Sequence, residues 1–107
     1  MDTFQALSDP NRRRIIELIA ARGQLTASDI SENFKISAPA ISQHLKVLRE
    51  AKLVDMEKRA QQRIYTINTA SIHEIEEWAR KMVKTWDERF KKLDKLLEDL
   101  KKKGGKK

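Results

Sequence analysis

The chain has 107 residues, of which 39% are hydrophobic and 36% are charged, and its 23 lysines and arginines outweigh 16 acidic residues to give a formal net charge of +7. This composition fits one small domain, and the positive charge favours a polyanionic partner because neutralising phosphates releases counterions. The absence of cysteine excludes disulfides, thiolate metal sites and thiol redox switches. With no long apolar run and no visible signal peptide, we expect a cytoplasmic protein without a membrane partner.

The first elements are a short amphipathic segment and a helix. Phe4 and Leu7 form one apolar edge of the segment. Asp9 has the side chain of an N-cap, and it precedes a proline, which is well suited to the first helical position. These signals predict a helix over residues 10–22, which ends before a glycine.

Two more helices follow in close succession. Thr26 has Asp29 three residues after it, which is close to a capping box and predicts the start of one helix. Ser37 is an N-cap candidate and Pro39 lies early in the next helix, which we expect to end near Ala51. Two short helices joined by a tight turn are typical of a helix-turn-helix.

The pattern then changes to two short strands. Residues 53–57 and 63–67 have roughly alternating polarity, and a polar loop over residues 58–62 separates them. A hairpin that follows a helix-turn-helix is the wing of a winged helix. The loop contains no glycine, so its boundaries are set only approximately by the sequence.

A long helix ends the chain, with Asn68 or Thr69 as its cap. Its apolar residues recur every three or four positions: Ile72, Ile75, Ala79, Met82, Trp86, Phe90, Leu93, Leu97 and Leu100. So small a core cannot cover this stripe, and a second copy of the helix is the simplest cover. The predicted fold class is mainly α with a small β-hairpin, with one winged helix-turn-helix and dimerisation domain over residues 1–100. We expect the Lys/Gly-rich tail, residues 101–107, to be disordered.

The helix after Ser37 has the pattern of a DNA-reading helix. Ile41, Leu45 and Leu48 share one face, which predicts that the opposite, polar face lies outward. Gln43 offers a donor and an acceptor that fit adenine. For His44, a structural hydrogen bond and a DNA contact are both open. The DNA contacts predicted for this segment are Ser37, Ala38, Pro39, Ala40, Ser42, Gln43, His44 and Lys46.

Further DNA contacts are predicted at the tip of the wing, where an ordinary polar turn is the alternative. They are Arg59, Gln61, Gln62 and Arg63. The densest basic cluster is Arg12, Arg13 and Arg14, but consecutive residues surround a helical turn and cannot all face DNA. We expect a structural role for at least two of these arginines, for example an ion pair with Glu17.

Two stretches, residues 7–15 and 37–54, resemble the ArsR/SmtB family of bacterial repressors, and the resemblance covers about residues 3–100. Trp78 and Trp86 look like those of a cysteine-free branch of that family. The resemblance implies a homodimeric repressor that binds double-stranded DNA at an inverted-repeat operator and pairs through its first and last helices. The residues this places at the dimer interface are Phe4, Leu7, Ile75, Trp78, Ala79, Met82, Trp86, Phe90, Leu93 and Leu97.

Three alternatives were weighed against a DNA-binding repressor. A metal-responsive repressor would use His73 with Glu76 and Glu77, but two histidines in the whole chain are few for a zinc site, so no metal or other cofactor is expected. Catalysis has no support, since the sequence has no Gly-rich phosphate loop and no nucleophile-and-base motif. A protein-interaction module without DNA binding stays open because residues 25–51 are charge-neutral.

Overall fold

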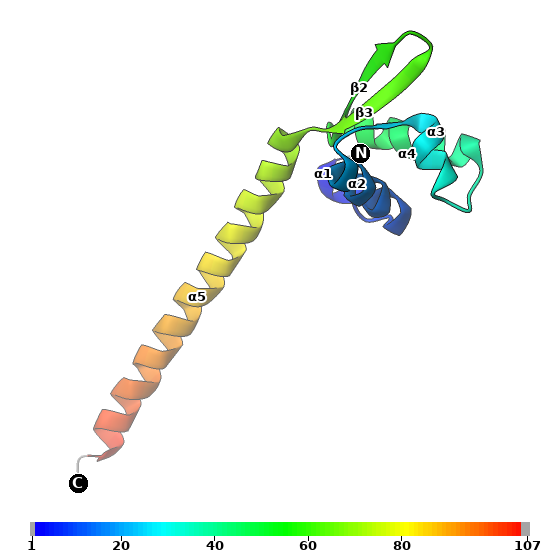
Figure 1. Ribbon diagram of the computed structural model, residues 1–107. Helices are drawn as coiled ribbons and strands as arrows, with labels where there is room; N and C mark the ends of the chain where they lie inside the picture. The colour runs from blue at the N-terminus through cyan, green and yellow to red at the C-terminus, as the bar shows by residue number, and fades with distance from the viewer. Residues whose placement is uncertain (1, 106–107) are drawn as a thin grey trace. The chain divides into compact units, whose positions relative to one another are not determined.

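The chain was analysed as a computed structural model that describes residues 2–105 (Figure 1). The helices are α1 (Thr3–Ala6), α2 (Pro10–Arg22), α3 (Ala27–Glu32), α4 (Ala38–Glu50) and α5 (Thr69–Gly105). The strands are β1 (Leu25–Thr26), β2 (Val54–Arg59) and β3 (Gln62–Ile67). This order confirms the predicted fold class, a winged helix-turn-helix with a long C-terminal helix. The chain divides after Ile72 into two compact units.

Helix α2 begins and ends where the sequence predicts. The Asp9 carboxylate accepts hydrogen bonds from the backbone N–H groups of Asn11, at 2.8 Å, and Arg12, at 3.1 Å. These bonds satisfy two of the donors that the first helical turn leaves without partners. Gly23 closes the helix with a φ of 86°, which a glycine adopts without strain, and its N–H donates to the Ile19 carbonyl at 2.7 Å.

Side-chain caps also fix the starts of α3 and α4. Thr26 and Asp29 form a reciprocal capping box: the Thr26 hydroxyl accepts from the Asp29 N–H at 3.1 Å, and the Asp29 carboxylate accepts from the Thr26 N–H at 3.2 Å. The Ser37 hydroxyl accepts from the Ala40 N–H at 3.2 Å. The two helices therefore start at the predicted residues, and only residues 33–37 separate them.

The core of the first unit combines the apolar faces of these helices with the base of the sheet. Its largest fully buried side chains are Ile15, Ile19, Ile30, Ile41, Leu45, Leu48, Leu53 and Val54. Burial of one such side chain contributes about 1.5–3 kcal/mol to folding, so this cluster holds α4 at a fixed rotation about its axis.

The sheet has three antiparallel strands in the order β1-β3-β2. The β2–β3 ladder runs from the Val54–Ile67 pair to the Arg59–Gln62 pair, so the predicted five-residue loop shortens to a two-residue turn. Ala60 adopts a φ of 54° in that turn, where a glycine would have marked it in the sequence. Strand β1 was not predicted, because two residues are too few to show an alternating pattern.

Helix α5 starts at the predicted cap, since the Asn68 side-chain oxygen accepts from the Ala70 N–H at 3.1 Å. The helix continues to Gly105, so residues 101–105 are helical where the sequence predicted a disordered tail. Lysine is a good helix former and its charge suits a helix C-terminus, which accounts for the difference. The prediction for Lys106 and Lys107 falls outside the described residues. Within residues 2–105, no helix is long and apolar enough to span a membrane.

Candidate nucleic-acid interface

Helix α4 separates its apolar and polar side chains as its periodicity predicts. Ile41 and Leu45 are each 2% exposed and Leu48 is fully buried. Ser42, Gln43 and Lys46 are exposed on the other side. Since the inward residues are locked in the core, the outward ones present hydrogen-bonding groups on a rigid helix. Their contact with DNA stays a prediction.

The start of α4 is exposed and built of small residues. Ser37, Ala38 and Pro39 are exposed and Ala40 is half-buried. The Ser37 hydroxyl is engaged as the cap, so its first role is structural. The remaining N–H groups of the first turn, together with the helix dipole, favour an anion at this end of a 13-residue helix.

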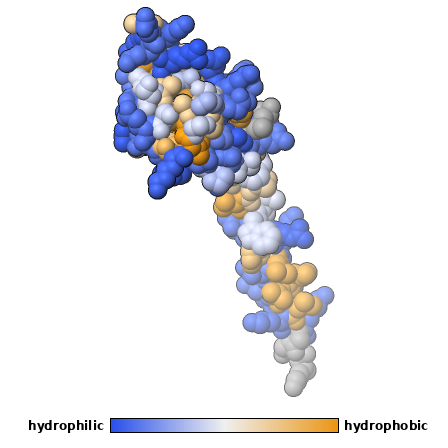
Figure 2. All heavy atoms as spheres, turned by 90° about the vertical axis from the view of Figure 1, so that its right-hand side faces the viewer, coloured by the Kyte–Doolittle hydropathy of each residue, from blue (hydrophilic) through white to orange (hydrophobic). Residues whose placement is uncertain are grey.

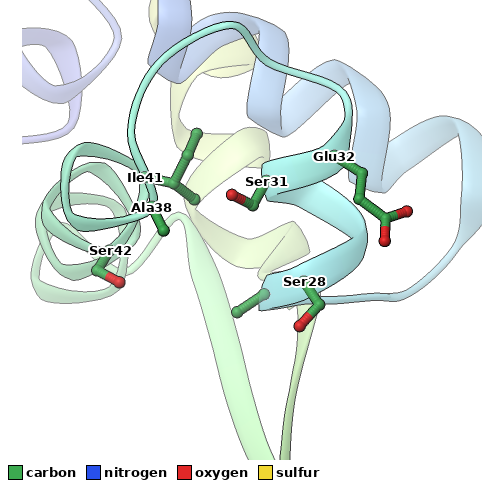
Figure 3. Close-up of a pocket in the computed structure, with 7 residues that line it drawn as sticks. Ser28, Ser31, Glu32, Ala38, Ile41 and Ser42 are labelled. Carbon is green, nitrogen blue, oxygen red and sulfur yellow. The ribbon is translucent and has the colours of Figure 1, made fainter.

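A groove of about 440 Å³ lies between α3 and α4 (Figure 3). Its walls, from both helices, are Ala27, Ser28, Ser31, Glu32, Ala38, Ile41 and Ser42. The groove brings the Ser31 side chain close to the polar face of α4, which sequence reasoning missed because it depends on how the two helices pack.

His44 is half-buried and lies against α2. The Arg12 guanidinium lies 3.4 Å from its Nδ1 atom. This distance lies at the long end of the hydrogen-bond range, and the arginine can only donate. Of the two roles considered for His44, the structure supplies a structural hydrogen bond, and a DNA contact stays a prediction.

The three consecutive arginines of α2 all make structural contacts. The Arg12 Nε donates to the Ala6 carbonyl at 2.6 Å, and Arg13 donates to the Leu7 carbonyl at 2.8 Å. The Arg14 guanidinium lies 5.2 Å from the centre of the Phe34 ring, a cation–π contact. Arg12 and Arg13 therefore bind the carbonyls at the end of α1, and the ion pair with Glu17 stays a prediction.

Asp9 lies near Arg12 and His44, and its pKa is lowered from the ordinary value. Burial raises the pKa of the carboxyl, but the backbone N–H groups of Arg12 and Asn11 and the positive charges of His44 and Arg12 lower it by more. The net pKa therefore lies below the ordinary value for aspartate.

The tip of the wing is exposed. Arg59 forms an ion pair with Glu57 at 3.2 Å, but both side chains are more than half exposed, so the pair contributes little stability. Gln61, Gln62 and Arg63 are also exposed. The wing is therefore accessible to a ligand, as its proposed role requires.

A second hollow, of about 450 Å³, connects the wing to α4. It brings Arg63 of β3 together with Ser42, Gln43 and Lys46 of α4. Pro39 lines the same hollow, so five residues that the sequence predicted to bind DNA line one concave surface, although 17 or more positions separate Arg63 from the others.

The residues predicted at a dimer interface are mostly exposed in the single chain. Met82, Trp86 and Phe90 have exposed fractions of 46%, 60% and 48%, and the rings of Trp86 and Phe90 meet edge to face with centres 5.2 Å apart. The hydrophobic side chains on the surface of α5 are visible in Figure 2. The other predicted residues divide into exposed ones, Phe4, Trp78, Ala79, Leu93 and Leu97, and half-buried ones, Leu7 and Ile75.

The metal site considered at His73 gains no further ligand in the single chain. His73 and Glu77 lie one helical turn apart on α5. Over residues 2–105, no group of three or more histidine or acidic side chains is arranged to hold a metal ion.

Comparison with known proteins yields a consistent set of matches. The family model described as "Bacterial regulatory protein, arsR family" matches residues 9–56. The transcriptional repressor SdpR of Bacillus subtilis is 36% identical over 86 residues, which cover 80% of this chain and 94% of that protein. An arsenical resistance operon repressor of Staphylococcus xylosus is 38% identical over 65 residues, which cover 61% of this chain and 62% of that protein. The solved structure of an ArsR-like transcriptional regulator from Rhodococcus sp. RHA1 gives a TM-score of 0.75 at 26% identity, over 87% of each chain.

Proposed function

Since the chain belongs to the arsR family of bacterial regulatory proteins, whose members are DNA-binding transcriptional regulators and not enzymes, we propose that it represses transcription as a homodimer bound to an inverted-repeat operator. Bound there, the dimer blocks access of RNA polymerase to a promoter. The protein acts in the cytoplasm, where a regulator of transcription reaches the chromosome.

The observation that carries this proposal is the division of α4 into a buried apolar face and an exposed polar face. An α-helix fits the major groove of B-DNA, where each base pair presents a distinct pattern of donors and acceptors. Gln43 is the side chain proposed to read adenine, and Ser42 and Lys46 are proposed to bond to bases or phosphates. Arg59, Gln61, Gln62 and Arg63 of the wing supply backbone contacts.

The exposed apolar stripe of α5 supports the homodimer. Five large side chains of the stripe are 46–60% exposed, which is unfavourable for a helix that stays alone in water: Met82, Trp86, Phe90, Leu93 and Leu97. Pairing with a second copy, together with Phe4 and Leu7, covers the stripe. A two-fold dimer then presents two α4 helices about 34 Å apart, one turn of DNA. The two units of each chain act together as one DNA-binding and dimerisation domain.

The test is selection of bound duplexes from a random pool by the full-length chain, followed by gel shifts with the enriched duplex. Gln43→Ala should weaken binding to that duplex by about 1–3 kcal/mol, the value of one good base contact, and relax preference at one position in each half-site. Binding to an unrelated duplex should change little. A Gln43→Ala variant with unchanged preference would refute the reading role, and a chain that binds no duplex would refute the function.

A further inference from the structure

The hollow between α4 and the wing is lined by two charged residues that the proposed DNA contacts do not include. Besides Lys46 and Arg63, its walls include Arg49 and Glu50 from the last turn of α4. Three cations and one anion thus surround a space of about 450 Å³ that also borders Gln43. The sequence alone does not indicate that Arg49 and Glu50 lie near Arg63, because this depends on how the sheet packs against α4.

Several other arginines of the first unit have side-chain partners. Arg12 and Arg13 donate to backbone carbonyls, and Arg59 pairs with Glu57. Within residues 2–105, the side chains of Arg49 and Arg63 form no hydrogen bond, ion pair or ring contact. Three cations against one carboxylate leave the hollow with a net positive charge, so an anion bound there is favoured.

We propose that this hollow binds one phosphodiester of the DNA backbone, held by Arg49 and Arg63. The inference rests on the proposed function and adds Arg49 to the contacts that position α4. A phosphate bound beside Gln43 fixes the position of α4 relative to the base edges in the major groove. Glu50 on the same wall repels the backbone and limits the affinity for DNA of any sequence.

The first experiment measures affinity for a mixed-sequence duplex over a series of salt concentrations, because a phosphate contact acts on every sequence. Arg49→Ala should reduce the magnitude of the log–log salt slope by about 0.9 and weaken binding about five- to tenfold at low salt. Arg49→Lys should retain most of the slope. The matched control is Arg22→Ala, which removes the same charge from the last turn of α2, also a 13-residue helix, and should change neither quantity.

A second variant removes a negative charge from the hollow, whereas Arg49→Ala removes a positive one. Glu50→Gln removes the repelling charge from an exposed position, so it should strengthen binding to the same duplex severalfold. Thermal unfolding of each variant separates a change in the site from a change in stability. Weaker binding by Glu50→Gln would contradict the proposal.

The outcomes also separate this inference from the function on which it rests. If the wild-type chain binds the duplex with a clear salt dependence and Arg49→Ala behaves like Arg22→Ala, the phosphate site is wrong and the repressor stands. If the wild-type chain binds no duplex, the function itself fails. Titration with inorganic phosphate is the third arm: saturable binding that Arg49→Ala abolishes, with duplex binding intact, would assign the hollow to a free anion and overturn the proposal.

Discussion

The Asp9 carboxylate stabilises the first turn of α2. It also lies near Arg12 of α2 and His44 of α4, which contact each other. It accepts two backbone hydrogen bonds, and its pKa lies below the ordinary value. Asp9→Ala should lower the free energy of unfolding by about 1 kcal/mol, the usual value of an N-cap. Urea unfolding of the two proteins at neutral pH measures the difference.

The contribution of Asp9 should also depend on pH. A carboxyl whose pKa is lower in the folded state stabilises the fold above its unfolded pKa, and this stabilisation is lost as the pH falls through the folded pKa. Asp9→Asn keeps an N-cap side chain without the charge. The difference in stability between the wild type and Asp9→Asn should therefore shrink on acidification below the unfolded pKa, and a difference that grows would contradict this account.

Ala60 gives a second prediction for a single residue. Its φ of 54° costs an alanine about 1–2 kcal/mol, while the added freedom of a glycine in the unfolded chain offsets about 0.4–1 kcal/mol of any gain. Ala60→Gly should therefore raise the free energy of unfolding by about 0.5 kcal/mol. Ala21→Gly, on the exposed side of α2, is the control and should lower it by about 1 kcal/mol, which thermal unfolding detects.

Among the elements, those governed by local chemistry were predictable. Asp9, Thr26 and Ser37 begin their helices as caps, and the apolar spacing of α4 predicts which face is buried. Strand β1 was missed, because its existence depends on pairing with β3 and not on its own two residues. The two-residue turn at Ala60 was missed because no glycine marks it and the pairing of β2 with β3 sets its length.

Side-chain contacts between elements were the least predictable part of the candidate site. The spacing of Arg12, Arg13 and Arg14 indicates that they cannot share a face, but only the fold assigns them to the carbonyls of α1 and to a ring on α3's C-terminal side. The hollow that joins Arg49 to Arg63 likewise appears only once β3 is placed beside α4. Sequence patterns identify faces, and the tertiary fold decides which faces meet.

The exposed apolar stripe of α5 gives a prediction about self-association. Leu93→Glu places a charge in the middle of the exposed stripe and should convert the dimer to a monomer, because an unpaired buried charge costs several kcal/mol. Lys92→Glu, one position off the stripe, is the control and should leave the dimer intact. Light scattering after size-exclusion chromatography gives both masses, and a wild-type monomer would contradict the proposed interface.

For the whole molecule, the proposed function needs both the positive net charge of +7 and the polar face of α4. Charge alone gives salt-dependent affinity for any DNA, whereas sequence preference needs base contacts. In the proposed homodimer, a two-fold axis places one short helix at each of two half-sites, so the operator should repeat the symmetry of the protein.

The central claim is that α4, duplicated in a homodimer, reads base edges in the major groove. The most direct measurement is the sequence that the full-length chain enriches from a random duplex pool, compared with the sequence enriched by Gln43→Ala. The account predicts an inverted repeat with half-site centres about 10 base pairs apart, and loss of preference in the variant at the same position of each half-site. No enriched sequence, or the same sequence from both proteins, would contradict it.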